Sequence, residues 1–144
     1  MPGPSELLWM EAEAPTVISS AVDIVTARQR GRALALELGF NGADVTLIAA
    51  AISEVARNIV DHAKHGEIAM TGIESPVGGR RGIEIIARDQ GPGIRDVAQA
   101  MQYGYSTRKG LGVGLPGAKW LMDEFDIVSE LGRGTTITMR KWRR

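Results

Sequence analysis

The stretch GIEIIARD (residues 82–89) runs directly into QGPGI (residues 90–94). The first part alternates apolar and polar side chains, which predicts a strand with one buried face. Side chains two residues apart share a face, so Asp89 ends the same row as Ile83 and Ala87 and points into the layer that covers this row. Because burying an unpaired carboxylate is costly, we expect Asp89 to meet groups that donate hydrogen bonds.

The turn after Asp89 has two interpretations. Gly91 and Gly93 remove the side chains on both sides of Pro92, which lets another molecule approach the backbone closely. An Asp before such a turn also commonly accepts a hydrogen bond from the turn itself. Taken alone, the motif leaves a ligand contact and a simple turn cap equally open.

The composition is that of an ordinary globular domain and excludes several kinds of site. The chain has 144 residues, 44% of them hydrophobic, and 17 basic side chains balance 17 acidic ones. No overall basic field therefore favours nucleic acid or a membrane surface, and we interpret the basic residues 140–144 as a solvated strand end. There is no cysteine, which excludes disulfides, thiolate catalysis and cysteine-ligated zinc.

The N-terminal residues 1–10 lack the basic region and long apolar stretch of a signal peptide. No apolar run elsewhere approaches the ~20 residues that a bilayer requires. Met10 could serve as an alternative start. We therefore expect a leader at 1–10, a single domain at 11–144, and a cytoplasmic protein without membrane or nucleic-acid partners.

Apolar periodicity and turn residues predict the element order βααββαββ, which is typical of an α/β two-layer sandwich. We expect a mixed β-sheet with the helices packed on one face. The predicted strands span 16–20, 67–74, 82–89, 125–131 and 135–142, and the helices span about 21–38, 41–62, 97–101 and 115–124. The first helix is expected to bury Val22, Val25, Ala33 and Leu36, and the second to bury Ile48, Ile52, Val55 and Ile59.

Three polar residues of the second helix lie beside its apolar stripe. Glu54, Asn58 and Asp61 fall within about 60° of arc at 3.6 residues per turn, which places them at the edge of the core. A carboxamide oxygen such as that of Asn58 suits Mg²⁺, which prefers oxygen ligands and shares its shell with phosphates. Glu54 could orient or deprotonate a hydroxyl group. The alternative is a solvated helix flank with ordinary polar neighbours.

A glycine-rich loop spans residues 103–114 and leads into the helix predicted at 115–124. Its glycines satisfy G-x-G-x-x-G at 112–117, but no strand precedes them, and Ala118 stands where a Walker A loop has Lys. What remains is a flexible loop that ends at a helix N-terminus, where backbone N–H groups bind phosphate oxygens. Arg108 and Lys109 would add two positive charges there.

These separate stretches together resemble the conserved boxes of the GHKL ATPase/kinase superfamily (the Bergerat fold). EVARN (54–58) resembles its N box, DQGPG (89–93) its G1 box and GLGVG (110–114) its G2 box. GTT (134–136) is similar to the terminal Gly-Thr that helps to hold adenine. The resemblance covers about residues 16–142.

Within the superfamily the chain is most similar to the small serine/threonine kinases of bacterial partner-switching systems, above all those of the stressosome. The phrases that carry this closer similarity are ISEVARNI (52–59), YST (105–107), GVGLPG (112–117) and LMDEF (121–125).

The resemblance implies an enzyme that holds ATP and Mg²⁺ between its helices and its sheet. Asp89 would contact the adenine amino group, Asn58 would bind Mg²⁺, and Glu54 would act as the base. Gly91 and Gly93 would line the adenine pocket, and residues 103–114 would form a mobile lid over ATP. Arg57 and Arg108 are both candidates for contacting the transferred phosphate. The expected nucleotide-binding set also includes Asp61, Ile94, Ser106, Thr107, Lys109, Gly110, Leu111, Gly112, Val113, Gly114, Leu115, Thr135 and Thr136.

The expected partners follow from the same resemblance. Such a kinase phosphorylates Ser or Thr on STAS-domain scaffold and antagonist proteins and, once released, activates a PP2C-type phosphatase; a weak homodimer stays open. One alternative is an anti-sigma factor of the same fold, which sequesters a sigma subunit. A stand-alone ATP hydrolase or a sensor histidine kinase is less favoured, because those relatives carry further domains. His62 and His65 are weak metal evidence without other ligands.

Overall fold

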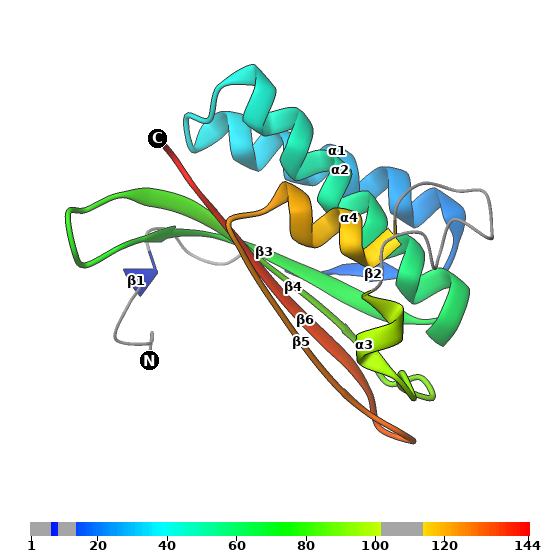
Figure 1. The fold of residues 1–144 in the computed structure, drawn as a ribbon. Helices are drawn as coiled ribbons and strands as arrows, with labels where there is room; N and C mark the ends of the chain where they lie inside the picture. Colours follow the sequence, from blue (N-terminus) through cyan, green and yellow to red (C-terminus); the bar gives the residue numbers. More distant parts are fainter. Residues whose placement is uncertain (1–6, 9–13, 102–113) are drawn as a thin grey trace.

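The computed structural model describes residues 7–8, 14–101 and 114–144, which form a sheet covered on one face by helices (Figure 1). The order predicted from the sequence is confirmed. The strands are β1 (Leu7–Leu8), β2 (Thr16–Ile18), β3 (Gly66–Glu74), β4 (Arg81–Asp89), β5 (Glu124–Glu130) and β6 (Gly134–Trp142). The helices are α1 (Ala21–Glu37), α2 (Gly42–Asn58), the π-helix η1 (Ile59–Ala63), α3 (Val97–Ala100) and α4 (Gly114–Leu121).

The strand order across the sheet is β1-β3-β4-β6-β5, with β2 also paired to β3. Every pairing recorded for the described residues is antiparallel, so our expectation of a mixed sheet is wrong. The strands β4 and β5 run in the same direction, as a connection through α4 requires, but β6 lies between them. Two residues of the expected leader, Leu7 and Leu8, pair with β3 and extend its edge.

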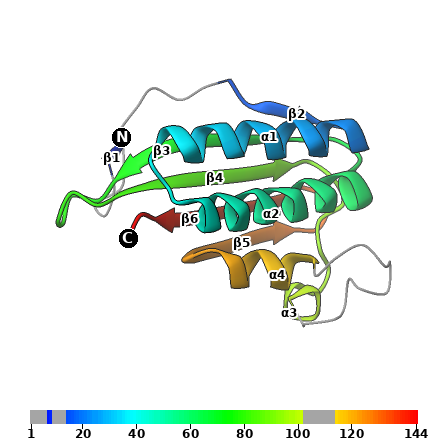
Figure 2. The same cartoon turned by 90° about the horizontal axis from the view of Figure 1, so that it is seen from above.

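The helix layer places α2 at its centre, with α1 on one side and α4 on the other (Figure 2). The apolar stripe predicted for the second helix is confirmed, since Ile48, Ile52 and Val55 of α2 and Ile59 of η1 are at most 1% exposed. It packs over the inward row of the sheet, which includes Ile85 of β4 and Ile137 of β6. Asp89 continues this row, as predicted, and is half-buried at its end.

The face of α1 that packs on the core is opposite to the predicted one. The buried residues include Ala27, Gly31 and Leu34, whereas Val22 and Leu36 are 71% and 57% exposed. At 100° per residue both sets have helical spacing and lie on opposite sides of the helix. The small residues face inward because α1 lies close to α2: a Cβ added at Gly31 would clash with Ile52. Close packing, which periodicity does not report, selects the face.

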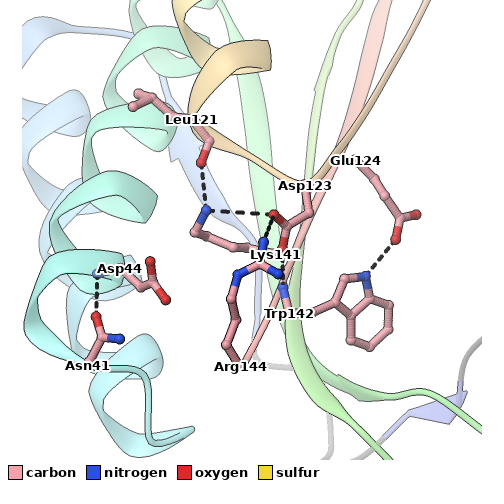
Figure 3. A network of polar contacts seen from close by, with 8 residues as sticks. All are labelled: Asn41, Asp44, Leu121, Asp123, Glu124, Lys141, Trp142 and Arg144. Carbon is pink, nitrogen blue, oxygen red and sulfur yellow. Dashed lines mark hydrogen bonds and ion pairs between the residues drawn. The ribbon is translucent and has the colours of Figure 1, made fainter.

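The helix α4 ends at Leu121, three residues before the predicted end. The carbonyl oxygen of Leu121 accepts a hydrogen bond from the buried Lys141 Nζ at 2.9 Å. Asp123, which was predicted to lie in the helix, accepts a hydrogen bond from the backbone N–H of Trp142 at 2.8 Å. Figure 3 shows how this network, with Arg144 on Asp123 and the Trp142 indole on Glu124, ties the end of α4 to β6. The chain therefore enters β5 at Glu124.

Candidate nucleotide-binding and phosphoryl-transfer site

The helix that carries Glu54 and Asn58 changes geometry at its end. The sequence predicts one helix to His62, but α2 ends at Asn58 and continues as the π-helix η1. Lys64 stops it in the left-handed conformation at φ 71°, with its N–H donating to Ile59 O. Wide turns of this kind are rare and frequently mark functional sites. Because a π-helix has more residues per turn than an α-helix, Asp61 does not follow the face of α2 on which Glu54 and Asn58 lie. Asp61 is half-buried.

Glu54 is held by two different partners. Its side chain is 11% exposed and pairs with Arg57 Nη1, 3.2 Å from Oε1. Oε1 also accepts a hydrogen bond from the backbone N–H of Gly114 at 3.2 Å. Gly114 is the first residue of α4, so the carboxylate sits at the helix end where we expect phosphate oxygens. A carboxylate is favoured there by the same free N–H groups and helix dipole that favour a phosphate.

Asp89 lies at the end of β4, directly opposite Thr135 of β6. Its Oδ1 accepts a hydrogen bond from Gly91 N–H at 3.0 Å, which is the turn cap proposed as the simpler alternative. Within the part of the chain that the structure describes, no hydrogen bond to Oδ2 is recorded. The turn cap thus occupies one oxygen of the carboxylate and leaves the second for another donor, so both interpretations of Asp89 are compatible.

Glycines bring the separate segments together. A Cβ added at Gly66 would lie 2.9 Å from Ile59 Cγ2 and 3.1 Å from Asp89 Cβ, so the end of α2 and the end of β4 approach each other across it. At Gly91 an added Cβ would lie 2.6 Å from Ala63 Cβ. Gly93, at φ 80°, packs against the backbone of Glu130 at the end of β5. Side chains at these positions would push the segments apart.

Ser129 of β5 is a site residue that the motifs do not reveal. Its hydroxyl accepts from the backbone N–H of Ile94 at 2.7 Å and lies 2.8 Å from Thr135 Oγ1. It thereby links the turn after Asp89 to the strand that faces Asp89. The alternation of residues 124–130 could have placed Ser129 on the inward face, but nothing in the sequence indicates that its partner is a backbone group 35 residues away.

Replacing Ser129 with Ala should weaken ATP binding about fivefold, because one hydrogen bond worth about 1 kcal/mol no longer holds Ile94 against Thr135. Calorimetric titration with ATP measures the effect. Ser129→Thr, which keeps the hydroxyl, should restore affinity. Ser75→Ala is the matched control, since the hydrogen bonds of the Ser75 hydroxyl to the described residues stay within its own hairpin, at Val77. Equal affinity in Ser129→Ala and Ser75→Ala would contradict a positioning role for Ser129.

Some of the predicted site residues converge and others do not. Contacts join Glu54 to Arg57 and Gly114, and they join Asp89 at the end of β4 to Gly91, Gly93, Ile94 and Thr135 at the start of β6. Asn58 ends α2 and Asp61 lies in η1, whose Ala63 approaches Gly91. Thr136 follows Thr135 on the strand and so lies on the opposite face of the sheet, paired with Arg88. The Leu115 side chain is buried in the core. Ser106, Thr107, Arg108, Lys109, Gly110, Leu111, Gly112 and Val113, and with them most of the expected lid, lie outside the described residues.

Asn58 fits a magnesium ion that arrives with phosphates better than a preformed cage. Among the described residues no group of three or more histidine and acidic side chains could hold a metal. Asn58 is half-buried at the end of α2 and offers one neutral oxygen, which suits an ion that keeps water and phosphate ligands. His62 and His65 are exposed.

No helix in the described ranges has the length and apolarity needed to span a bilayer.

Comparison with known proteins finds a family model and several relatives that match most of the chain. The family model of the histidine kinase-like ATPase domain matches residues 18–141. The chain is 54% identical over 122 residues to serine/threonine-protein kinase RsbT of Bacillus subtilis, covering 85% of this chain and 90% of that protein. It is 32% identical over 119 residues to the anti-sigma F factor of a Thermoanaerobacter species, covering 81% and 82% of the two chains.

A solved structure shares the fold. The crystal structure of the RsbU and RsbW domains of a Mycobacterium tuberculosis protein matches 92% of this chain with a TM-score of 0.57. The sequence identity is 24%, and the matched part is 33% of that chain. This likeness supports the two-layer arrangement of one antiparallel sheet and one helix layer.

Proposed function

The chain belongs to the family of histidine kinase-like ATPase domains, and we propose that it is the serine/threonine kinase of a bacterial partner switch. It transfers the γ-phosphoryl group of ATP to Ser or Thr of STAS-domain scaffold and antagonist proteins. Once released from them, it binds and activates a PP2C-type phosphatase in stress signalling. We place this activity in the cytoplasm.

One observation carries the proposal. The chain is 54% identical to a protein named as a serine/threonine-protein kinase and 32% identical to an anti-sigma F factor, over similar lengths. The positions of three side chains support it further. Glu54 and Asn58 lie in the last turns of α2, and Ile59, which follows α2, approaches Asp89 at the end of β4 across Gly66. A kinase site needs one group for the base, one for the ion and one for the adenine, and these three side chains suit those roles.

The roles we propose follow from the chemistry of each side chain. Asp89 Oδ2 accepts from the adenine amino group while Oδ1 holds the turn. Asn58 supplies an oxygen to Mg²⁺, which when bound neutralises phosphate charge. Glu54 accepts the proton of the acceptor hydroxyl. Arg57, paired with Glu54 at 3.2 Å, both orients that carboxylate and adds positive charge near the transferred group.

Incubation with labelled ATP and a STAS-domain scaffold protein tests the function. We expect label on Ser or Thr of the scaffold, dependent on Mg²⁺, and none on the kinase itself. Phosphoamino-acid analysis identifies the acceptor. A scaffold that stays unlabelled while the protein hydrolyses ATP would replace the kinase with an ATP hydrolase.

An anti-sigma factor is the second candidate, because several relatives at 31–33% identity are anti-sigma F factors. Such a protein would bind a sigma subunit and use phosphoryl transfer only to release it. A pull-down with purified sigma subunit and purified STAS scaffold separates the two candidates. Retention of the sigma subunit alone would favour the anti-sigma role.

A further inference from the structure

Helix α1 carries a second apolar face that no described residue covers. Val22, Val25 and Leu36 are 71%, 40% and 57% exposed, and Ala33 beside them is also exposed. Val22, Val25 and Leu36 are three of the eight exposed large hydrophobic residues found in the described ranges. A surface helix normally buries one stripe and presents polar residues on the other side. Exposed apolar side chains gathered on one helix face are typical of interaction sites.

The spacing on this outer face suits another helix. Val22, Val25, Gln29, Arg32 and Leu36 follow one another at intervals of three, four, three and four residues, which is the seam along which two helices pack. From Val22 to Leu36 the seam extends over about 21 Å at 1.5 Å per residue. That length matches an apposed helix of about four turns.

The charges of this outer face indicate an acidic partner. Arg32 lies in the seam and Arg28 lies beside it, and both side chains are exposed. Neither has an ion pair among the described residues. A second copy of this helix fits poorly for reasons of charge. In an antiparallel pair that crosses at Gln29, the Arg28 side chains of both copies lie on the same edge of the interface. In a parallel pair, Arg32 of one copy faces Arg32 of the other. Like charges so placed disfavour pairing, whereas carboxylates on a partner helix would be favoured.

The position of α1 separates this face from the site of phosphoryl transfer. Helix α2 lies between α1 and α4 (Figure 2). Glu54 points from α2 towards the start of α4, not towards α1. A phosphoryl acceptor has to approach the α4 side, where the catalytic residues and Gly114 meet. A protein on the outer face of α1 leaves that approach open, so this face suits a partner other than the acceptor.

We propose that the outer face of α1 is the docking surface for an amphipathic helix of a partner protein, with carboxylates along the edge that meets Arg28 and Arg32. The partner is not the phosphoryl acceptor. This inference rests on the proposed function, in which a PP2C-type phosphatase is the non-substrate partner, and that phosphatase is the probe for the test. Binding would bury the Val22 and Leu36 side chains against the apolar stripe of the partner helix.

The test compares surface variants in two separate assays. The double variant Val22→Ser with Leu36→Ser should bind the purified PP2C-type phosphatase at least tenfold more weakly by biolayer interferometry. Phosphorylation of the STAS scaffold should stay unchanged. Val128→Ser is the matched control, because Val128 is as exposed as Leu36, 57%, but lies on β5. Thermal unfolding should coincide for all variants, since the altered side chains are exposed.

A second pair of variants tests the charge. Arg28→Glu with Arg32→Glu should weaken phosphatase binding tenfold or more at low salt and reduce its salt dependence. Unchanged phosphatase affinity in the Val22 and Leu36 double variant would overturn the proposal, and so would a loss of scaffold phosphorylation in that variant alone. A wild-type dimer that the double variant dissociates would assign the face to a second copy. Absence of scaffold phosphorylation in the wild type would instead overturn the proposed function.

Discussion

Replacing Asp89 with Asn is expected to weaken ATP binding about ten- to a hundredfold while leaving the fold intact. A hydrogen bond to a charged group is worth about 1.5–3 kcal/mol, and each 1.4 kcal/mol is a factor of ten in affinity. The Asn side chain keeps an oxygen for Gly91 N–H, so the turn cap survives. Its amide nitrogen would then face the adenine amino group, and two donors would oppose each other.

Isothermal titration calorimetry with ATP and GTP measures this effect. The preference for ATP over GTP should fall together with the ATP affinity, because adenine has an amino group at C6, where guanine has a carbonyl oxygen that cannot donate to Asp89. Asp126→Asn is the matched control, since Asp126 is exposed on β5. If Asp89→Asn binds ATP as the wild type does, then Asp89 is only a turn cap and its adenine role is wrong.

Replacing Glu54 with Gln is expected to reduce phosphoryl transfer by about a hundredfold or more, with ATP affinity nearly unchanged. A positioned general base contributes about 10²–10⁴-fold to a rate, and a carboxamide cannot take the proton. Gln retains an oxygen that can accept from Gly114 N–H. The start of α4 should therefore stay in place, and the variant isolates the loss of basicity.

Single-turnover transfer to the STAS scaffold and calorimetry with and without Mg²⁺ measure the two properties separately. Asn58→Ala serves as the counterpart: its nucleotide binding should lose its dependence on Mg²⁺, which Glu54→Gln should retain. Glu54→Ala goes further, because it also removes the acceptor for Gly114 and the partner of Arg57. A Glu54→Gln variant that transfers phosphate at more than a tenth of the wild-type rate would contradict the base assignment.

The position of Asp89 could be predicted from the sequence, but its contacts could be predicted only in part. Alternation over residues 82–89 was sufficient to orient the carboxylate inward, and the structure confirms its row and its half-buried position. It was not sufficient to show which donors reach the two oxygens of this carboxylate. The hydrogen bond from Gly91 N–H to Oδ1 is a local turn contact, whereas the position of Asp89 opposite Thr135 arises only in the folded sheet.

The buried face could be predicted from the sequence for α2 but not for α1. The stripe of α2 could be predicted because its buried face is large and aliphatic and its other face is polar. Helix α1 has two faces with helical spacing, and the one with the larger side chains is outside. Its core face is lined with small residues because the helices pack closely there. Hydrophobicity alone therefore predicted the wrong buried face of α1. The face that it predicted to be buried is exposed and is the docking surface that we propose.

Local order in the sequence determined the elements, the two-layer class and the three boxes, since backbone propensity, alternation and turn chemistry are properties of neighbouring residues. Tertiary structure alone decided the π-helical end of α2, the contact between Glu54 and Gly114, and the position of Ser129 between Ile94 and Thr135. Each of these joins residues far apart in the chain or depends on the space left between packed segments. Their physical cause is contact across the fold, which no local pattern encodes.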